Sequence, residues 1–252
     1  MHDAQNKPLL WHVPAPVHFD SRWPTPLKVG LMLLLIGSVY MFVDAPLTRW
    51  LLENKISEKL LRGDIRRESI WLEQYGQYVC TISVILAVAL CDKEGRRKSL
   101  AIVIVCLLTV LVSYALKDLC GRSRPMMFDD LHLQPGQWVW GGIIQGITGG
   151  SGYASFPSSH TTGAFALSAA LAWYYPRARG IFYALATIVA GLRVLNTAHW
   201  LSDVLAGALI AVTVARLALN AKLPGRMINA LPSRIRAFYL SDWPDHPRHD
   251  AK

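Results

Sequence analysis

Long apolar stretches alternate with short polar or charged segments along most of the chain. Each apolar stretch approaches the length of about 20 residues that a helix needs to cross the hydrocarbon core of a bilayer. The six predicted spans cover residues 27–43, 75–91 and 100–116, then 161–175, a stretch that begins at 180–191, and 200–217. The pattern therefore predicts an all-α, polytopic membrane protein with six transmembrane helices.

The segment between the first two spans has a different periodicity. Over residues 47–74, apolar residues recur at helical spacing and alternate with lysine, arginine and glutamate. This pattern predicts an amphipathic helix in the membrane interface. A soluble helix packed on another domain has the same pattern, but the sequence offers no second domain for it to pack against. The predicted organisation is thus a juxtamembrane segment (1–26), a six-span domain that includes this helix (27–218) and a basic tail (219–252).

Charge fixes the expected orientation of the spans. The chain is 52% hydrophobic and carries a net charge of +9, and its basic residues gather at the ends of apolar stretches, above all in the turns 93–98 and 177–179 and in the tail. Such a distribution favours a membrane surface over nucleic acid, and it places these turns in the cytoplasm. We expect an uncleaved, multi-pass protein of the cell membrane, in a bacterium the inner membrane. The four cysteines lack the spacing of a disulfide framework or a zinc site.

Three polar stretches emerge on the other, periplasmic or extracellular, face. In the last of them, His199 precedes Asp203 by one helical turn, so the carboxylate can accept a proton from one imidazole nitrogen and leave the other free. Arg193 lies on the same stretch. Charged groups beside an apolar segment are costly and usually functional. The plainer alternative is a His–Asp pair that only caps a helix.

The other two stretches supply anion-binding groups. Ser158, Ser159 and His160 open a predicted helix, where unpaired backbone N–H groups and the helix dipole attract an anion. Lys117 and Arg124 lie at the end of the third span and can point at the same anion. The alternatives are a simple serine cap and basic side chains that reach lipid headgroups.

Together these stretches resemble the three signature motifs of the type 2 phosphatidic acid phosphatase superfamily, Lys-x6-Arg-Pro, Pro-Ser-Gly-His and Ser-Arg-x5-His-x3-Asp. The resemblance covers residues 117–203 directly. Two positions depart from it, because Ser159 replaces the usual glycine and Leu192 replaces the usual serine. Neither departure removes a charged group, although the Ser159 side chain can crowd a close backbone approach.

The resemblance implies a role for each matching residue. His199 would attack phosphorus to form a phosphohistidine, Asp203 would orient His199, and His160 would protonate the leaving oxygen and then activate water. The phosphoryl oxygens would be held by Lys117, Arg124, Arg193, Ser158 and the N–H groups of Ser159 and His160. Three cations and a helix N-terminus meet the charge of phosphoryl transfer without a metal or another cofactor.

We therefore expect an enzyme that hydrolyses a membrane lipid phosphate or pyrophosphate, with bilayer lipids around it and no obligatory protein partner. Three alternatives stay open. In a phosphotransferase of the same fold, a second lipid would replace water as acceptor. A transporter or lipid-binding protein would use the basic residues to hold anionic headgroups but would not need two histidines. A haloperoxidase has a similar anion site, but such members of the family are soluble.

Overall fold

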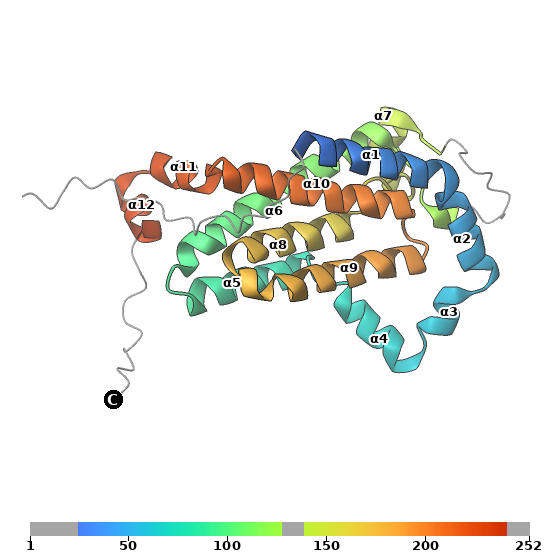
Figure 1. The fold of residues 1–252 in the computed structure, drawn as a ribbon, viewed down its shortest axis with the longest axis horizontal. Coiled ribbons are helices and arrows are strands. Elements are labelled where there is room, and N and C mark those ends of the chain that lie inside the picture. Colours follow the sequence, from blue (N-terminus) through green and yellow to red (C-terminus); the bar gives the residue numbers. More distant parts are fainter. Residues whose placement is uncertain (1–24, 128–138, 241–252) are drawn as a thin grey trace, which may run out of the picture.

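The computed structural model describes residues 25–127 and 139–240, and the first 24 residues, the segment 128–138 and the last 12 lie outside this description. Within the described residues all regular elements are α-helices or short 3-10 helices, joined by one isolated bridge between Arg122 and Trp140. The predicted all-α class is confirmed for this part of the chain (Figure 1).

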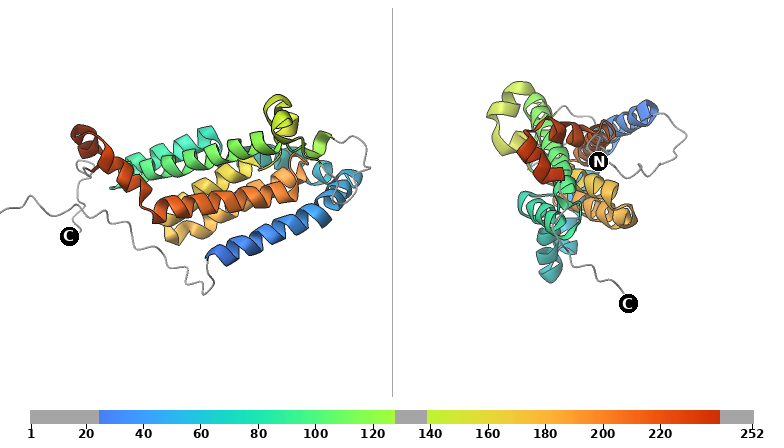
Figure 2. Two further views of the ribbon diagram at one scale, coloured as in Figure 1. Left: turned by 90° about the horizontal axis from the view of Figure 1, so that it is seen from above. Right: turned by 90° about the vertical axis from the view of Figure 1, so that its left-hand side faces the viewer.

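The long helices run side by side along one axis (Figure 2). They are α1 (Thr25–Phe42), α5 (Tyr78–Cys91), α6 (Gly95–Cys120), α8 (Ser159–Tyr174), α9 (Arg179–Leu195) and α10 (Leu201–Asn220). Each corresponds to one of the predicted apolar stretches. Helix α8 is central and packs against α6, α9 and α10. Its buried face consists largely of alanine, including Ala164 and Ala170, and small side chains let the surrounding helix backbones approach closely.

Three of these helices are long and apolar enough to cross a membrane on their own, namely α6, α9 with the turn before it, and α10. A fourth arises if α1 and α2 (Asp44–Glu53), which meet at 50°, form one bent span. Helices α5 and α8 have only 14 and 16 residues. The expected count of six spans is therefore not reached by length and composition. Many side chains on the outside of the bundle are apolar, such as Leu34 (70% exposed) and Val79 (77% exposed).

The segment 47–74 forms three short helices where the sequence pattern predicted one. Helices α2, α3 (Ile56–Leu60) and α4 (Gly63–Leu72) are separated by residues in the left-handed conformation, Lys55 (φ +50°) and Gly63 (φ +51°). A right-handed helix cannot continue through such residues. We refer to α3 and α4 as the arm, because they extend away from the bundle beside the end of α9 (Figure 1).

The predicted polar connection 117–154 is partly helical. Helix α6 continues to Cys120, where Gly121 ends it, and the short 3-10 helix η1 (Pro125–Met127) follows. Helix α7 (Gly142–Thr148) packs against α6, and a second 3-10 helix, η2 (Gly150–Tyr153), leads towards α8. The described part of this connection lies at the end of the bundle where α6 ends.

The opposite end of the bundle collects the basic turns. After α10, the predicted tail folds into α11 (Leu223–Ala230) and α12 (Ser233–Leu240). Helix α12 packs against α6, where Arg96 Nη1 donates to the Phe238 carbonyl at 3.2 Å. In the α5–α6 turn, Lys98 forms a 2.7 Å ion pair with Asp92, which also accepts a hydrogen bond from Tyr175 after α8. The turns 93–98 and 177–179 and the described part of the tail, residues 219–240, therefore share one end.

We predict that Gly163→Ala destabilises the bundle. A Cβ at Gly163 would lie 2.5 Å from the carbonyl oxygen of Gly76, closer than backbone contacts allow. Such overpacking typically costs about 1–3 kcal/mol. The matched control is Gly191→Ala in α9, where a Cβ meets no atom within 4 Å and helix propensity favours alanine by about 1 kcal/mol. Thermal unfolding in detergent should show a lower midpoint only for Gly163→Ala; equal midpoints would contradict the close approach.

Candidate active site

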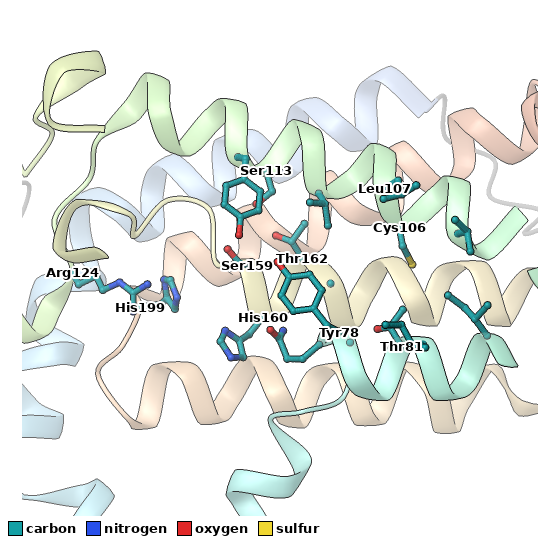
Figure 3. Close-up of a pocket in the computed structure, with 18 residues that line it drawn as sticks. Tyr78, Thr81, Cys106, Leu107, Ser113, Arg124, Ser159, His160, Thr162 and His199 are labelled. Carbon is teal, nitrogen blue, oxygen red and sulfur yellow. The ribbon is translucent and has the colours of Figure 1, made fainter. Parts of the chain in front are cut away.

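The three polar stretches meet at the end of the bundle opposite the basic turns. The C-terminus of α6, the N-terminus of α8 and the α9–α10 loop border a cavity of about 500 Å³. Arg124, Ser159, His160 and His199 line one part of it, and Figure 3 shows Arg124, His160 and His199 grouped there. Lys117, Ser158, Arg193 and Asp203 are not among the lining residues. The structure thus brings half of the predicted site residues to one cavity.

The rest of the cavity runs between α5 and α6 and is largely apolar. Its wall includes Ile82, Ile85, Val103, Leu107 and Val110. Ile82 and Leu107 line the cavity and are also 56% and 57% exposed, so the cavity opens on the side of the bundle.

His199 is held in one orientation by a backbone carbonyl. Its ring is buried, and Nδ1 lies 2.9 Å from the Ser155 carbonyl oxygen. Because a carbonyl only accepts hydrogen bonds, Nδ1 carries the proton and Nε2 keeps its lone pair. The predicted partner Asp203 is farther away, with Oδ2 at 3.7 Å from Nδ1. Ser155, which the sequence analysis did not single out, is therefore the direct partner of His199.

The α9–α10 loop explains why His199 and Arg193 lie together. Thr197 has a φ of +48°, and the backbone N–H groups of Ala198 and His199 both donate to the Arg193 carbonyl, at 3.1 and 3.3 Å. The chain therefore turns tightly after α9. Burial lowers the pKa of His199 to about 4, although nearby Asp203 opposes this shift. At neutral pH the ring is uncharged, which is the form a nucleophile needs.

Asp203 is completely buried and its carboxylate accepts several hydrogen bonds. Oδ2 accepts from the Trp200 backbone N–H at 3.0 Å and from Ser155 Oγ at 2.6 Å, and Oδ1 accepts from Arg122 Nη1 at 2.5 Å. Asp203 thus caps α10 and fixes Ser155. Since the Ser155 carbonyl holds His199, Asp203 helps to orient the imidazole through Ser155, in addition to its direct electrostatic effect across 3.7 Å.

Arg122 is a residue that the sequence analysis missed. It is 1% exposed and joins Asp203 to Asp44, with Nη2 at 2.8 Å from Asp44 Oδ2. Its guanidinium also lies 5.0–5.2 Å from the ring centroids of Tyr40, Trp140 and Trp200. One signal was present in the sequence, because Asp44 is a lone carboxylate at the end of an apolar stretch, where a charge requires a partner.

The predicted cations have different surroundings. Lys117 Nζ donates to the carbonyls of Ala154 at 2.5 Å and Pro157 at 2.7 Å, so it holds the loop before α8 and keeps one of its three N–H donors. Arg124 and Arg193 each have a buried Nε without a hydrogen-bond partner in the described part of the chain. Burial lowers the pKa of Arg124, and the nearby Arg193 lowers it further. Buried, unsatisfied donors and crowded cations favour a bound anion.

The start of α8 presents the predicted acid. His160 lies in the first turn, lines the cavity, and has no hydrogen-bond partner among the described residues. Ser158, the residue before α8, is buried, and its Oγ accepts from Thr161 Oγ1 at 3.1 Å, so this hydroxyl supports the turn. Ser159, which departs from the family pattern, lines the cavity. No three His, Cys, Asp or Glu side chains gather as a metal site would require in residues 25–127 and 139–240.

Two histidines and Arg124 line one end of a cavity whose remaining wall is apolar, and a charged group attached to an apolar chain would fit such a cavity. The model of the PAP2 superfamily matches residues 98–224, which is half of the chain and includes every predicted site residue. The chain therefore belongs to the PAP2 superfamily, and the resemblance inferred from the motifs is confirmed.

Two curated relatives share part of the sequence. The lipid A 1-phosphatase of Rhizobium johnstonii is 36% identical over 121 residues, covering 45% of this chain and 46% of the relative. The lipid A 1-phosphatase of Rhizobium etli is 35% identical over 121 residues, covering 45% and 49%. The chain spans about half the length of the curated relatives it matches. No solved structure matches it.

We predict that Arg122→Ala strongly destabilises the protein. The change leaves Asp44 and Asp203 buried without their cation, and removing one partner of a buried ion pair costs about 3–5 kcal/mol. The control is Arg67→Ala, which breaks a solvent-exposed pair with Asp64 worth about 0–1 kcal/mol at most. Chemical unfolding in detergent compares the two variants. Similar losses would show that the buried network does not carry this stability.

Proposed function

We propose that the protein is a membrane phosphatase that hydrolyses a lipid phosphate or pyrophosphate through a phosphohistidine on His199. The observation that carries this proposal is the cavity itself, whose catalytic end holds His160, His199 and Arg124 and whose remaining wall is apolar and opens sideways between α5 and α6. A phosphate ester with an attached acyl chain matches both parts.

In the proposed first step, the lone pair on His199 Nε2 attacks phosphorus, and the bond from phosphorus to the ester oxygen breaks. The leaving oxygen takes the proton of His160, which acts as general acid. In the second step His160, now neutral, removes a proton from water. The resulting oxygen attacks phosphorus, the P–N bond breaks, and phosphate leaves with His199 restored.

The charge on the transferring group would be met by groups already in place. Arg124 and Arg193 offer buried N–H groups that lack partners, and Lys117 keeps one donor. The free backbone N–H groups of the first turn of α8 add the positive end of a helix dipole. Donors fixed by the fold need no rearrangement when charge develops, which is the main source of catalysis in phosphoryl transfer.

The names of the relatives suggest a particular lipid. Both are called lipid A 1-phosphatases, and the region they share with this chain extends over about 121 residues. We therefore propose lipid A carrying a 1-phosphate as the first candidate substrate, with an acyl chain near the phosphate occupying the space between Ile82 and Leu107.

We further propose the complete six-span arrangement, in which α5, α8 and the bent pair α1–α2 cross the bilayer together with the three spans that length and composition support. Helix α8 is surrounded by protein and touches little lipid, so it needs less apolar length. The juxtamembrane segment 1–26 and the basic tail 219–252 flank this domain. The basic turns lie at the end opposite the cavity, so the positive-inside tendency supports an active site on the non-cytoplasmic face of the cell membrane.

Two other functions compete with this proposal. A phosphotransferase would use the same first step and pass the phosphoryl group to a second lipid. A carrier of anionic lipids would need cations but no nucleophile. His199 has a fixed tautomer with a free Nε2, and His160 has no structural partner, so two costly polar groups serve no purpose in a carrier.

We predict that the purified protein releases phosphate from lipids in preference to soluble phosphates. The panel contains lipid A 1-phosphate, phosphatidate, phosphatidylglycerol phosphate and polyprenyl pyrophosphate, with glycerol phosphate as the soluble control. Each buried methylene contributes about 0.8 kcal/mol, so loss of the acyl chain should lower kcat/KM by roughly a hundredfold or more. Activity should persist in chelator. Equal turnover of glycerol phosphate and lipids would argue against the cavity as the substrate site.

We also predict that alanine variants of the two histidines lose different steps of the reaction. His199→Ala removes the nucleophile, so turnover should vanish even for an aryl phosphate, whose leaving group needs no proton. His160→Ala removes the general acid and base, whose contribution to the rate is typically about a hundred- to ten-thousand-fold. This variant should still form phosphohistidine from the aryl phosphate and should then hydrolyse the phosphohistidine slowly. Rapid quenching with detection of acid-labile phosphoprotein separates the variants. Phosphoprotein in His199→Ala would contradict the assignment of the nucleophile.

A further inference from the structure

Arg193 forms an ion pair with a glutamate near the site. Its Nη1 donates to Glu73 Oε2 at 2.7 Å, and both side chains are mostly buried, at 12% and 14% exposure. Charged pairs that are shielded from water are stronger and more rigid than surface pairs. Glu73 follows the last residue of α4 and is separated from Arg193 by 120 positions in the chain.

The same carboxylate also holds the loop that carries the proposed nucleophile. Asn196 Nδ2 donates to Glu73 Oε1 at 2.7 Å, and Asn196 Oδ1 accepts from Ser57 Oγ at 3.1 Å. One oxygen of Glu73 therefore binds Arg193 and the other binds Asn196, three residues before His199. Ser57 thus attaches the loop to the start of α3, and Glu73 attaches it to the end of α4.

Glu73 is itself placed by a well-anchored stretch of chain. Two residues after it, Tyr75 is buried, and its hydroxyl lies 2.9 Å from Ser168 Oγ in α8. The following residues Gly76 and Gln77 line the cavity. Because Glu73 is fixed relative to both α8 and the cavity, it can fix Arg193 relative to them as well.

We propose that Glu73 is a positioning residue that holds Arg193 and the 193–199 loop in the geometry needed for phosphoryl transfer. This inference rests on the proposed function. The contact with Glu73 uses Nη1, and the buried Nε of Arg193 has no partner in the described residues. Because the guanidinium is rigid and planar, a hydrogen bond at one nitrogen also fixes the direction of the other N–H donors. Little orientational freedom is then lost when a phosphoryl oxygen binds.

The key variant is Glu73→Gln, which keeps the size of the side chain and removes its charge. The matched control is Glu68→Gln, an exposed glutamate of α4 with no contact to the loop. We expect Glu73→Gln to lower kcat for the lipid by roughly tenfold to a hundredfold, the scale at which misplacing one catalytic contact slows a reaction. KM should change little, because the apolar wall of the cavity is unchanged. Glu68→Gln should behave as the wild type.

A double-mutant cycle tests whether Glu73 acts through Arg193. If it does, Glu73→Gln added to Arg193→Ala should lower kcat by no more than about twofold beyond Arg193→Ala alone, because the group it positions is already gone. Inhibition by vanadate, which occupies the phosphoryl site without an acyl chain, should weaken in parallel with kcat. Unfolding midpoints of all variants are measured in the same detergent.

Three outcomes would overturn the inference: an effect of Glu73→Gln equal to that of Glu68→Gln, full additivity with Arg193→Ala, or a fall in kcat that a lowered unfolding midpoint explains. The wild type is assayed first with the lipid panel. A wild type without phosphatase activity defeats the proposed function, whereas an active wild type with a fully active Glu73→Gln variant defeats only the role of Glu73.

Discussion

The site depends on one buried cation between two buried carboxylates. Arg122 binds Asp203 at the start of α10 and Asp44 at the start of α2, and Ser202 donates its backbone N–H to Asp44 as well. Charges in a low-dielectric interior are stable only when paired and hydrogen-bonded, so these elements cannot shift independently without exposing an unpaired charge. The end of the first apolar helix, the connection after α6 and the start of α10 are thereby fixed to one another.

This network also fixes the position of His199, through a backbone group of the loop before α8. Asp203 accepts from Ser155 Oγ, and the carbonyl of Ser155 holds His199 Nδ1. Lys117 binds the carbonyls on either side, those of Ala154 and Pro157. The loop before α8 is therefore held by an anion on one side and a cation on the other. This double attachment fixes the first turn of α8, which carries His160, relative to His199, and both histidines line the same cavity.

Residue spacing was sufficient to predict the convergence of three distant stretches at one end of the bundle, because alternate ends of antiparallel helices lie on the same side. It could not reveal Ser155 or the carbonyl partners of Lys117, since any residue supplies a carbonyl. Asp44 signalled only that it needs a partner, and Glu73 gave no signal: the periodicity around each residue describes only its own helix, while its partner is more than 70 residues away. The break at Lys55 was also invisible, because a lysine in the left-handed conformation leaves no mark in an amphipathic pattern, whereas the break at Gly63 lies at a glycine, which the sequence does show.

The charge balance of the site gives a reason for the carboxylate of Glu73 beside Arg193, the cation that we propose binds phosphate. Arg122 is paired with Asp44 and Asp203, so in the proposed mechanism Lys117, Arg124 and Arg193 are the cations that meet the phosphoryl group. A phosphatase must bind its substrate and also release a multiply charged phosphate ion. Three unopposed cations in a water-poor cavity would hold that product tightly, because electrostatic attraction strengthens as the local dielectric constant falls. In that mechanism Glu73 offsets one of the three charges, and it binds Nη1 of Arg193 while the Nε donor of Arg193 has no partner among the described residues.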